Sequence, residues 1–282
     1  MRFSVAPIAL IIAAPDAAQQ VQVEEVSFLS RDGKTQVKGY LFKPANAPAK
    51  APAVVMMHGR GGAYSSLAKG KYDATTLASR HKAWGQLLAE NGYLALMVDD
   101  FGAVGFPAGF EAGTYKDRPE AVDEVNFRPL HAYGALRYLQ SRPDVVPTRV
   151  ALLGWSNGAS ATLAAMADDK PGDMRKIGFS AGVALYPGCG LKKRFDKDGY
   201  KPYHPVRVFM GTADEEVSPK LCETFVARSK GNGHDIALRM FEGATHSYDT
   251  PTKSRQSVEA NATAKAATEA DILAFLAEKL KK

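Results

Sequence analysis

The stretch of sequence that decides the fold reads VALLGWSNGASATLAAMA and occupies residues 150–167. Its first four residues are all apolar, which is typical of a strand buried on both faces. The pentapeptide Gly154-Trp155-Ser156-Asn157-Gly158 comes next, and residues 159–167 predict a helix. A strand, a G-x-S-x-G turn and a helix in this order lift a serine out of the strand end, which is the arrangement of a serine nucleophile.

The glycines at both ends of the turn have a steric reason. The turn is so tight that side chains at Gly154 or Gly158 would collide with the neighbouring strand and helix. A surface turn that merely carries two glycines is the alternative. The strand before the turn and the helix after it favour the nucleophile.

The same alternation of apolar runs and helical patterns extends over the rest of the chain. Strands are predicted at residues 53–57, 93–98, 181–185, 206–210 and 236–241, and helices at about 77–91 and 130–140, from near Pro219, and at 257–280. Residues 21–28 and 36–42 predict an antiparallel hairpin at an edge. We therefore expect one α/β domain over residues 21–282, with a mostly parallel central sheet and helices on both faces.

The composition is that of an ordinary globular protein, with 45% hydrophobic and 23% charged residues. The formal net charge is +6, yet the Lys and Arg residues are scattered. The one local cluster, residues 192–194, is followed by Asp196 and Asp198, which indicates a solvated loop rather than a phosphate-binding patch. We therefore expect no nucleic-acid partner, and the sequence leaves the oligomeric state open.

Residues 1–20 look like a secretory signal peptide, because Arg2 precedes an apolar run at residues 5–14 and polar residues follow. The run is too short to span a bilayer, which takes about 20 apolar residues. Pro15 and Asp16 leave the cleavage site poorly defined. We expect an exported protein, periplasmic or secreted. A hydrophobic N-terminal arm on a cytoplasmic protein is the alternative.

A serine hydroxyl is a poor nucleophile at neutral pH and needs a histidine base that a carboxylate orients. Of the six histidines, only His246 lies in a loop after the last predicted strand, where a base would stand over the carboxyl edge of the sheet. Asp214 lies just past the strand at residues 206–210. The order Ser156, Asp214, His246 is the one expected of the α/β-hydrolase fold.

Other acids compete with Asp214 for the third position. Glu215 and Glu216 are its neighbours, and Asp196 and Asp198 follow the preceding strand. Asp214 could instead cap the next helix. A histidine with a purely structural role in its loop is the alternative for the base.

The tetrahedral intermediate of acyl transfer needs hydrogen-bond donors for its oxyanion. We expect one to be the backbone N–H of Asn157, the residue after the nucleophile. The run HGRGG at residues 58–62 follows a predicted strand, and its glycines let the backbone approach a substrate closely. We nominate the N–H of Arg60 as the second donor. A plain glycine turn is the alternative.

These motifs together resemble the dienelactone hydrolase family. The likeness rests on MHGRGG at residues 57–62, VDDF at 98–101, GWSNG at 154–158, YPGC at 186–189, GTAD at 211–214 and GATH at 243–246. It runs from about Ala53 to the C-terminus. The resemblance implies an α/β-hydrolase fold without a cofactor, and it carries the catalytic triad over onto Ser156, Asp214 and His246.

The namesake enzymes of the family use a cysteine nucleophile, whereas this chain has Ser156. A thiolate is nucleophilic with little help, but a serine depends fully on its base and carboxylate. The enol-lactone substrate of the namesakes therefore does not transfer. A serine member looks more like a general carboxylesterase, or a lactonase-like enzyme, acting on a small-molecule ester. A peptidase or acyl transferase with the same triad is an alternative, as is a non-catalytic binding protein on this scaffold.

The two cysteines, Cys189 and Cys222, form no C-x-x-C pair and have no histidine at metal-ligand spacing, so we expect no metal site. Cys189 follows one predicted strand and Cys222 opens the helix after the next. Both therefore lie near the carboxyl edge of adjacent strands. A disulfide is expected in an exported protein, and two reduced thiols in a cytosolic one.

Residues 101–127 form a long loop rich in glycine and aromatic residues. Loops of this length are usually functional or mobile. We interpret it as the substrate-facing rim, with Arg118 and Arg128 as candidate ligands for a substrate carboxylate. The alternative is that both are surface arginines paired with Glu120, Asp123 or Glu124.

Overall fold

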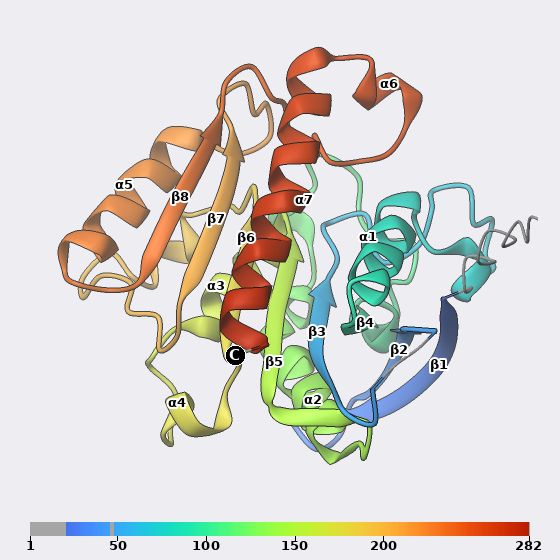
Figure 1. Ribbon diagram of the computed structural model, residues 1–282. Helices are drawn as coiled ribbons and strands as arrows, with labels where there is room; N and C mark the ends of the chain where they lie inside the picture. The colour runs from blue at the N-terminus through green and yellow to red at the C-terminus, as the bar shows by residue number, and fades with distance from the viewer. Residues whose placement is uncertain (1–20, 46–47, 282) are drawn as a thin grey trace, which may run out of the picture.

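The computed structural model describes residues 21–45 and 48–281, and an eight-stranded sheet runs through it (Figure 1). The strands lie in the order β1-β2-β4-β3-β5-β6-β7-β8. They are Gln22–Leu29 (β1), Gln36–Lys43 (β2), Ala51–Met57 (β3), Leu94–Asp99 (β4), Val145–Trp155 (β5), Ala181–Leu185 (β6), Val206–Gly211 (β7) and Ile236–Phe241 (β8). The β1–β2 and β2–β4 pairings are antiparallel, and all the others are parallel. The predicted hairpin at one edge of a mostly parallel sheet is therefore confirmed.

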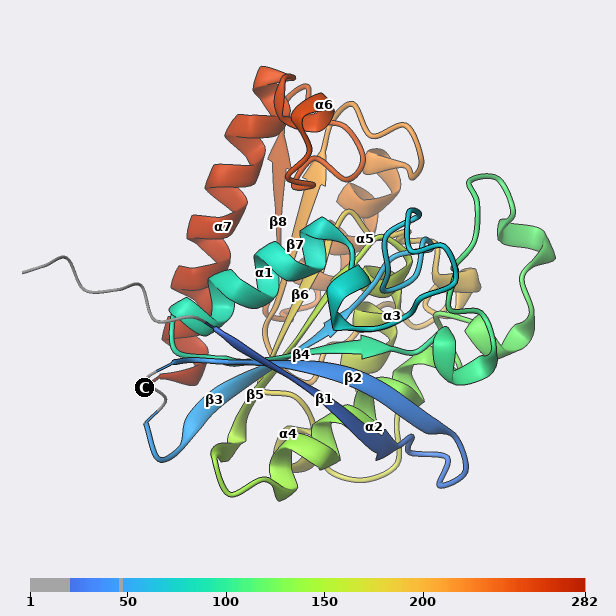
Figure 2. The ribbon, with the colours of Figure 1, turned by 90° about the vertical axis from the view of Figure 1, so that its right-hand side faces the viewer.

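Helices cover both faces of the sheet, as Figure 2 shows with α1 and α7 on one side and α2 and α3 on the other. The helices are Ser79–Glu90 (α1), Arg128–Ser141 (α2), Asn157–Met166 (α3), Met174–Ile177 (α4), Pro219–Gly231 (α5), Lys253–Gln256 (α6) and Glu259–Leu280 (α7). None of these described helices is both long enough and apolar enough to cross a bilayer. The prediction of an α/β-hydrolase fold with helices on both faces is confirmed.

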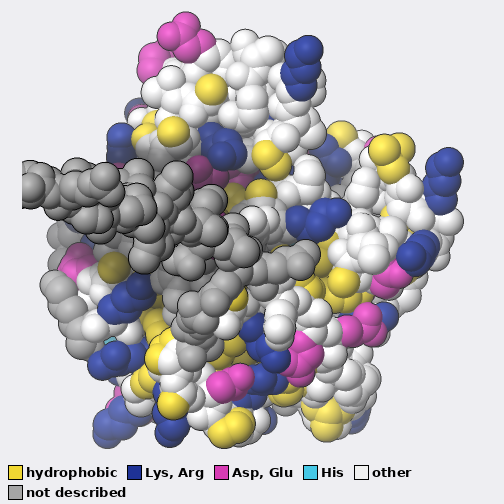
Figure 3. Space-filling model, turned by 45° about the vertical axis from the view of Figure 1, so that its right-hand side comes forward, with side chains coloured by type: hydrophobic (Ala, Val, Ile, Leu, Met, Phe, Trp, Pro, Cys, Tyr) yellow, Lys and Arg dark blue, Asp and Glu magenta, His cyan; other side chains and the backbone are white. Residues whose placement is uncertain are grey.

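Continuous apolar runs become the central strands because both faces of those strands are covered. Every residue of β3, β4 and β6 is buried. On the molecular surface, Lys and Arg side chains are dispersed among acidic and apolar ones on the face drawn in Figure 3. The predicted signal peptide at residues 1–20 lies outside the described residues.

Some boundaries differ from the predicted ones. Strand β5 begins at Val145, earlier than predicted, because its first residue pairs with Ala51 across an irregularity in the register. The predicted helix at 257–280 is present as the continuous helix α7, which begins at Glu259, and the short helix α6 before it was not predicted. The long loop after β4 contains three short 3-10 helices, at Gly102–Val104, Tyr115–Asp117 and Glu120–Val122.

The parallel strands all point the same way, so the loops that follow them meet at one edge of the sheet. These are the loops after β3, β4, β5, β6, β7 and β8. Every residue singled out for its chemistry lies in one of these loops or at the start of the helix that follows. The topology therefore determines where a site can form.

Because α2 packs closely against β1, a methyl group added at Gly134 should strongly lower the stability of the fold. A Cβ at Gly134 in α2 would lie 2.5 Å from the Leu29 carbonyl oxygen, so Gly134→Ala forces the helix away from the sheet. We expect a loss of about 1–3 kcal/mol in the free energy of unfolding, measured in urea.

Gly231→Ala is the matched control, because a Cβ at the end of α5 meets nothing within 4 Å. Alanine favours a helix, so this variant should gain about 0.5–1 kcal/mol. A Gly134→Ala protein as stable as the wild type would contradict the close approach of α2 to β1.

Candidate active site

Ser156 lies on the turn between β5 and α3 with φ at 51° and ψ at −117°. Such a conformation costs about 1–3 kcal/mol and persists only where the surroundings hold it. The Ser156 N–H donates to the Leu185 carbonyl at 2.9 Å. A Cβ at Gly154 would lie 2.3 Å from the Gly158 carbonyl oxygen, and one at Gly158 would lie 2.2 Å from that of Met57. The steric reason predicted for both glycines is confirmed.

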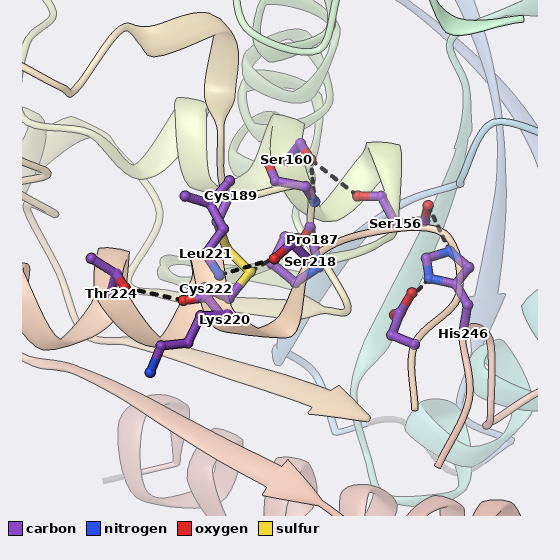
Figure 4. The surroundings of a disulfide bond; sticks show 12 residues. Ser156, Ser160, Pro187, Cys189, Ser218, Lys220, Leu221, Cys222, Thr224 and His246 are labelled. Carbon is purple, nitrogen blue, oxygen red and sulfur yellow. Dashed lines mark hydrogen bonds and ion pairs between the residues drawn. A yellow bond between two sulfur atoms is a disulfide. The ribbon is translucent and has the colours of Figure 1, made fainter. Parts of the chain in front are cut away.

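Two hydrogen bonds connect the three residues predicted as a triad. The Nε2 of His246 lies 2.9 Å from the Ser156 Oγ, and its Nδ1 lies 2.8 Å from Oδ2 of Asp214. Figure 4 shows the His246 ring turned toward Ser156. The other oxygen of Asp214 accepts the N–H groups of Glu216 and Val217, each at 2.9 Å. The structure therefore brings the three predicted residues together in one chain of contacts.

The two glutamates that compete with Asp214 have other partners. Glu215 accepts the backbone N–H of His246 at 2.8 Å. Glu216 binds the Arg60 guanidinium through both carboxylate oxygens, at 2.7 and 3.0 Å, and this hydrogen bonding holds the pKa of Glu216 below its usual value. Its carboxylate is 3.7 Å from the Nε2 of His246. Of these three acids, Asp214 is the one bonded to Nδ1.

A buried carboxylate that the motifs did not reveal lies three residues after the histidine. Asp249 accepts the indole N–H groups of Trp84 and Trp155 at 2.8 and 2.9 Å and the Tyr186 hydroxyl at 2.6 Å. The Arg80 guanidinium lies 3.6 Å away and compensates its charge. We call Asp249 and these four partners the Asp249 hub.

The hub connects the parts that carry the triad. Trp155 directly precedes Ser156, and Asp249 belongs to the same loop as His246. The Tyr186 ring packs edge-on against the His246 ring, with the centroids 4.7 Å apart. One carboxylate thus holds the turn at Ser156 and the loop of His246 in fixed relative positions. No local sequence pattern signals this, because Asp249 and its partners come from four separate segments.

The glycine-rich loop after β3 approaches Ser156 closely. A Cβ at Gly59 would lie 3.5 Å from the Cβ of Ser156. Arg60 and Asn157 line the same cavity as Ser156. This placement agrees with the expected positions of two oxyanion donors, and the use of their N–H groups stays a prediction.

The first half of the loop after β4 is fixed against this glycine-rich loop. The Phe110 N–H donates to the Arg60 carbonyl at 2.8 Å. Gly109 has a φ of 72°, and a Cβ there would lie 2.2 Å from the carbonyl carbon of Gly61. The two backbones therefore touch, and glycine is needed for the contact.

Arg128 is fully buried and holds several of these parts together. Its guanidinium donates to both carboxylate oxygens of Asp100, at 2.6 and 3.1 Å, and to the His58 carbonyl at 2.7 Å. It also donates to the side-chain oxygen of Asn157 at 2.5 Å. Burial acts to raise the pKa of Asp100, but Arg128 and His58 outweigh it and hold the pKa well below its usual value.

The prediction that Arg128 binds a substrate carboxylate is therefore wrong. Arg128 opens α2 beneath the loops, where Asp100 already compensates its charge, and it does not line the cavity. The alternative of a surface arginine is also wrong, since its partner acid is neither Glu120, Asp123 nor Glu124.

Arg118, in contrast, lines a cavity of about 750 Å³ above Ser156. Its guanidinium lies over the rings of Phe110 and Tyr115, 5.6 and 5.5 Å from their centroids. Burial and the charge of Arg60 lower the pKa of Arg118. Among the described residues, no carboxylate forms an ion pair with it.

Two of the three acids proposed as alternative partners of Arg118 are engaged elsewhere. Glu124 accepts the Tyr115 hydroxyl and the side-chain amide of Asn157. Asp123 pairs with Lys192. Arg118 therefore lines the cavity without a direct ion pair to a described acid, and Glu124 acts on its charge from a distance.

Residues 188–194, here called the 188–194 wall, form one side of the cavity. A disulfide joins Cys189 to Cys222 with the Cα atoms 5.1 Å apart, so the expected bridge is confirmed (Figure 4). Leu191, Lys192 and Lys193 follow with φ values of 40°, 50° and 61°. Each left-handed residue costs roughly 1–2 kcal/mol. The basic cluster expected as a solvated loop is thus also part of the cavity surface.

Within residues 21–45 and 48–281, no group of three or more His, Cys, Asp or Glu side chains is placed to hold a metal ion.

Comparisons with known proteins agree with the fold. The model of the dienelactone hydrolase family matches residues 37–280. The curated "Putative hydrolase YtaP" of Bacillus subtilis (strain 168) is 27% identical over 156 residues, which cover 54% of this chain and 51% of the relative. The match therefore spans about half the length of that protein.

Two solved structures illustrate the likeness of fold. A dienelactone hydrolase-like promiscuous phosphotriesterase from metagenomic libraries superposes with a TM-score of 0.66 at 18% identity, over 92% of this chain and 98% of the other. Brefeldin A esterase, a bacterial homologue of human hormone sensitive lipase, superposes with a TM-score of 0.64 at 16% identity, over 97% and 81%.

The hub predicts a large stability loss when Asp249 is neutralised. Asp249→Asn leaves the Arg80 guanidinium, whose side chain is 18% exposed, without its compensating acid. We expect the free energy of unfolding in urea to fall by about 3–5 kcal/mol. Asp235→Asn breaks an exposed pair with Arg207 and should cost at most about 1 kcal/mol. Equal losses in the two variants would contradict the role of the hub.

Proposed function

The chain belongs to the dienelactone hydrolase family, and from that premise we propose that it is a serine hydrolase that cleaves carboxylic esters through an acyl-enzyme on Ser156. The observation that carries the proposal is the contact chain from Asp214 through His246 to Ser156, with 2.8 and 2.9 Å between successive partners. This is the geometry that a base needs to activate a serine hydroxyl.

In the first half of the proposed reaction, the Ser156 Oγ attacks the ester carbonyl while His246 Nε2 takes its proton. Asp214 accepts the Nδ1–H of His246, which fixes the tautomer and stabilises the imidazolium that forms. The C–O bond to the alcohol then breaks, and His246 gives its proton to the leaving oxygen. The products are the free alcohol and an ester between the acyl group and Ser156.

In the second half, water attacks the acyl-enzyme while His246 takes a proton from the water. Collapse of the tetrahedral intermediate releases the carboxylic acid and returns the proton to Ser156. In both halves the oxyanion would accept the N–H groups of Asn157 and Arg60. Each such donor typically lowers the barrier by about 3 kcal/mol.

Arg118 is the residue we propose for recognition of an anionic substrate. No described acid forms an ion pair with it, and the rings of Phe110 and Tyr115 hold the guanidinium at the cavity. A guanidinium binds a carboxylate with two parallel hydrogen bonds. Esters that carry a free carboxylate away from the scissile bond are therefore the expected preference.

Export is also part of the proposal. A disulfide such as Cys189–Cys222 persists in oxidising compartments, including the periplasm and the exterior, and is rare in the cytosol. The bridge therefore supports an exported protein.

Ser156→Ala tests the proposed chemistry. We expect hydrolysis of p-nitrophenyl acetate to fall by about 10⁶-fold, because the remaining groups have no nucleophile to activate. Labelling by a fluorophosphonate, followed by mass spectrometry, should disappear as well. Ser141→Ala, at the exposed end of α2, is the control and should keep both signals. Full turnover in Ser156→Ala would rule the mechanism out.

The same assays separate the alternatives. A peptidase would turn over amides of the same acyl group, and an acyl transferase would transfer it to added alcohols or amines in preference to water. A binding protein on this scaffold would not be labelled at all.

Arg118→Gln tests the recognition of an anionic substrate. The KM for an ester with a free carboxylate should rise about tenfold or more, since a charged hydrogen bond is lost. The KM for its neutral methyl analogue should stay within about twofold. Arg137→Gln, an exposed arginine on α2, controls for the loss of charge. Equal effects on both esters would refute the assignment.

A further inference from the structure

The 188–194 wall combines a strained backbone with a covalent tether. Three successive residues other than glycine, from Leu191 to Lys193, have left-handed φ values. Residues of L chirality visit this region singly, and strained stretches persist where the surroundings determine them. The wall includes Gly188, Gly190, Leu191, Lys192 and Lys193 among the residues that line the cavity above Ser156.

The start of the wall is fixed to the nucleophile helix by Ser160. The Gly188 N–H donates to the Ser160 Oγ at 3.0 Å, and that oxygen lies 3.2 Å from the Gly188 carbonyl and 3.4 Å from the Ser156 carbonyl (Figure 4). Ser160 is buried. These contacts are independent of the disulfide. They hold Gly188 in place and leave the residues beyond it to be held by other means.

The disulfide anchors the middle of the wall to a rigid helix. Cys222 lies in the first turn of α5, where the Ser218 hydroxyl accepts the Leu221 N–H at 3.2 Å and caps the helix. The Cys222 sulfur is fully buried and lies 3.3 Å from the Pro187 carbonyl oxygen. Because α5 packs on β8, the bridge joins the wall to the body of the fold.

The far end of the wall is held by Arg194, which pairs with Asp169 at 2.7 Å and donates to the Val125 carbonyl at 3.0 Å. Leu191 is buried, and Lys192 pairs with Asp123, which belongs to the loop after β4. Lys193 has no ion-pair partner among the described residues. The triad is held separately, by the Asp249 hub and by the turn at Ser156. Release of the tether should therefore relax the middle of the wall, between Gly188 and Arg194, and leave the triad in place.

We propose that the Cys189–Cys222 bridge determines the acyl-chain selectivity of the cavity, because it holds the left-handed 188–194 wall against the space above Ser156. The proposal rests on the proposed function, since it assigns a selectivity to that same site. When the bridge opens, the wall relaxes away from the cavity. The kcat/KM for esters with long acyl chains then rises relative to that for esters with short ones.

The test compares the wild type with the double variant Cys189→Ser/Cys222→Ser. We expect the ratio of kcat/KM for p-nitrophenyl octanoate to that for p-nitrophenyl acetate to rise about tenfold. The rate of labelling by a small fluorophosphonate should stay within about twofold, because the triad is unchanged. Dithiothreitol, which reduces the bridge to two thiols, should shift the wild-type ratio in the same direction. It should not affect the double variant, which is the matched control.

An unchanged ratio with intact labelling would overturn the proposal and leave the bridge a purely structural role. Loss of labelling in the wild type itself would instead refute the proposed function. The double variant has not folded if it lacks the circular dichroism spectrum of the wild type. In that case the variant Leu191→Ala, with the bridge intact, tests the proposal. It should raise the same ratio, whereas Leu67→Ala, an exposed leucine outside the cavity, should not. An unchanged ratio in Leu191→Ala would overturn the proposal.

Discussion

A single buried carboxylate, Asp249, is the constraint on which the site depends. A carboxylate removed from water must be compensated by hydrogen bonds and charge, or the fold is destabilised. Here two indoles, a phenol and a guanidinium supply that compensation, and they come from three separate parts of the chain. The requirement to satisfy one acid therefore fixes the relative positions of α1, the turn at Ser156, the loop after β6 and the loop of His246. Arg128 likewise fixes the glycine-rich loop and Asn157 relative to each other by hydrogen bonds, and Asp100 compensates its charge.

This arrangement suits Ser156, which stands where the namesake enzymes of the family have a cysteine. A thiolate tolerates an imperfectly placed base, but a serine hydroxyl needs His246 at hydrogen-bond distance and in the right tautomer. The histidine is accordingly held on several sides, by Asp214 at the ring, by Glu215 at the backbone and by Tyr186 against its face. The chain belongs to a hydrolase family, and its histidine is held by several contacts. Both observations support the proposed hydrolysis with His246 as the base.

The sequence alone was enough to predict the sheet and the three proposed triad residues, because the patterns that indicate them lie within short stretches of the chain. Buried parallel strands are apolar throughout, and their carboxyl ends meet at one edge, so a residue just past a strand end can be assigned to the site from its position in the chain. Arg128 and Asp249 could not be assigned in this way, because their partners are distant in sequence. The left-handed backbone at Leu191 and Lys192 was equally hidden, since neither residue type favours it. The early start of β5 depends on its pairing with Ala51, which no pattern within β5 indicates.

The backbone contact between Gly109 and Gly61 divides the long loop after β4 into two parts with different evolutionary freedom. Up to Phe110 the loop is in register with the glycine-rich loop, so an insertion or deletion there would displace the proposed oxyanion donor. Between Phe110 and Val122 the loop is exposed or half-buried, and its length there could change without disturbing the sheet or the proposed triad. Relatives that act on different substrates could therefore diverge by altering the length of the segment that carries Tyr115 and Arg118, while the chemistry beneath it stays the same.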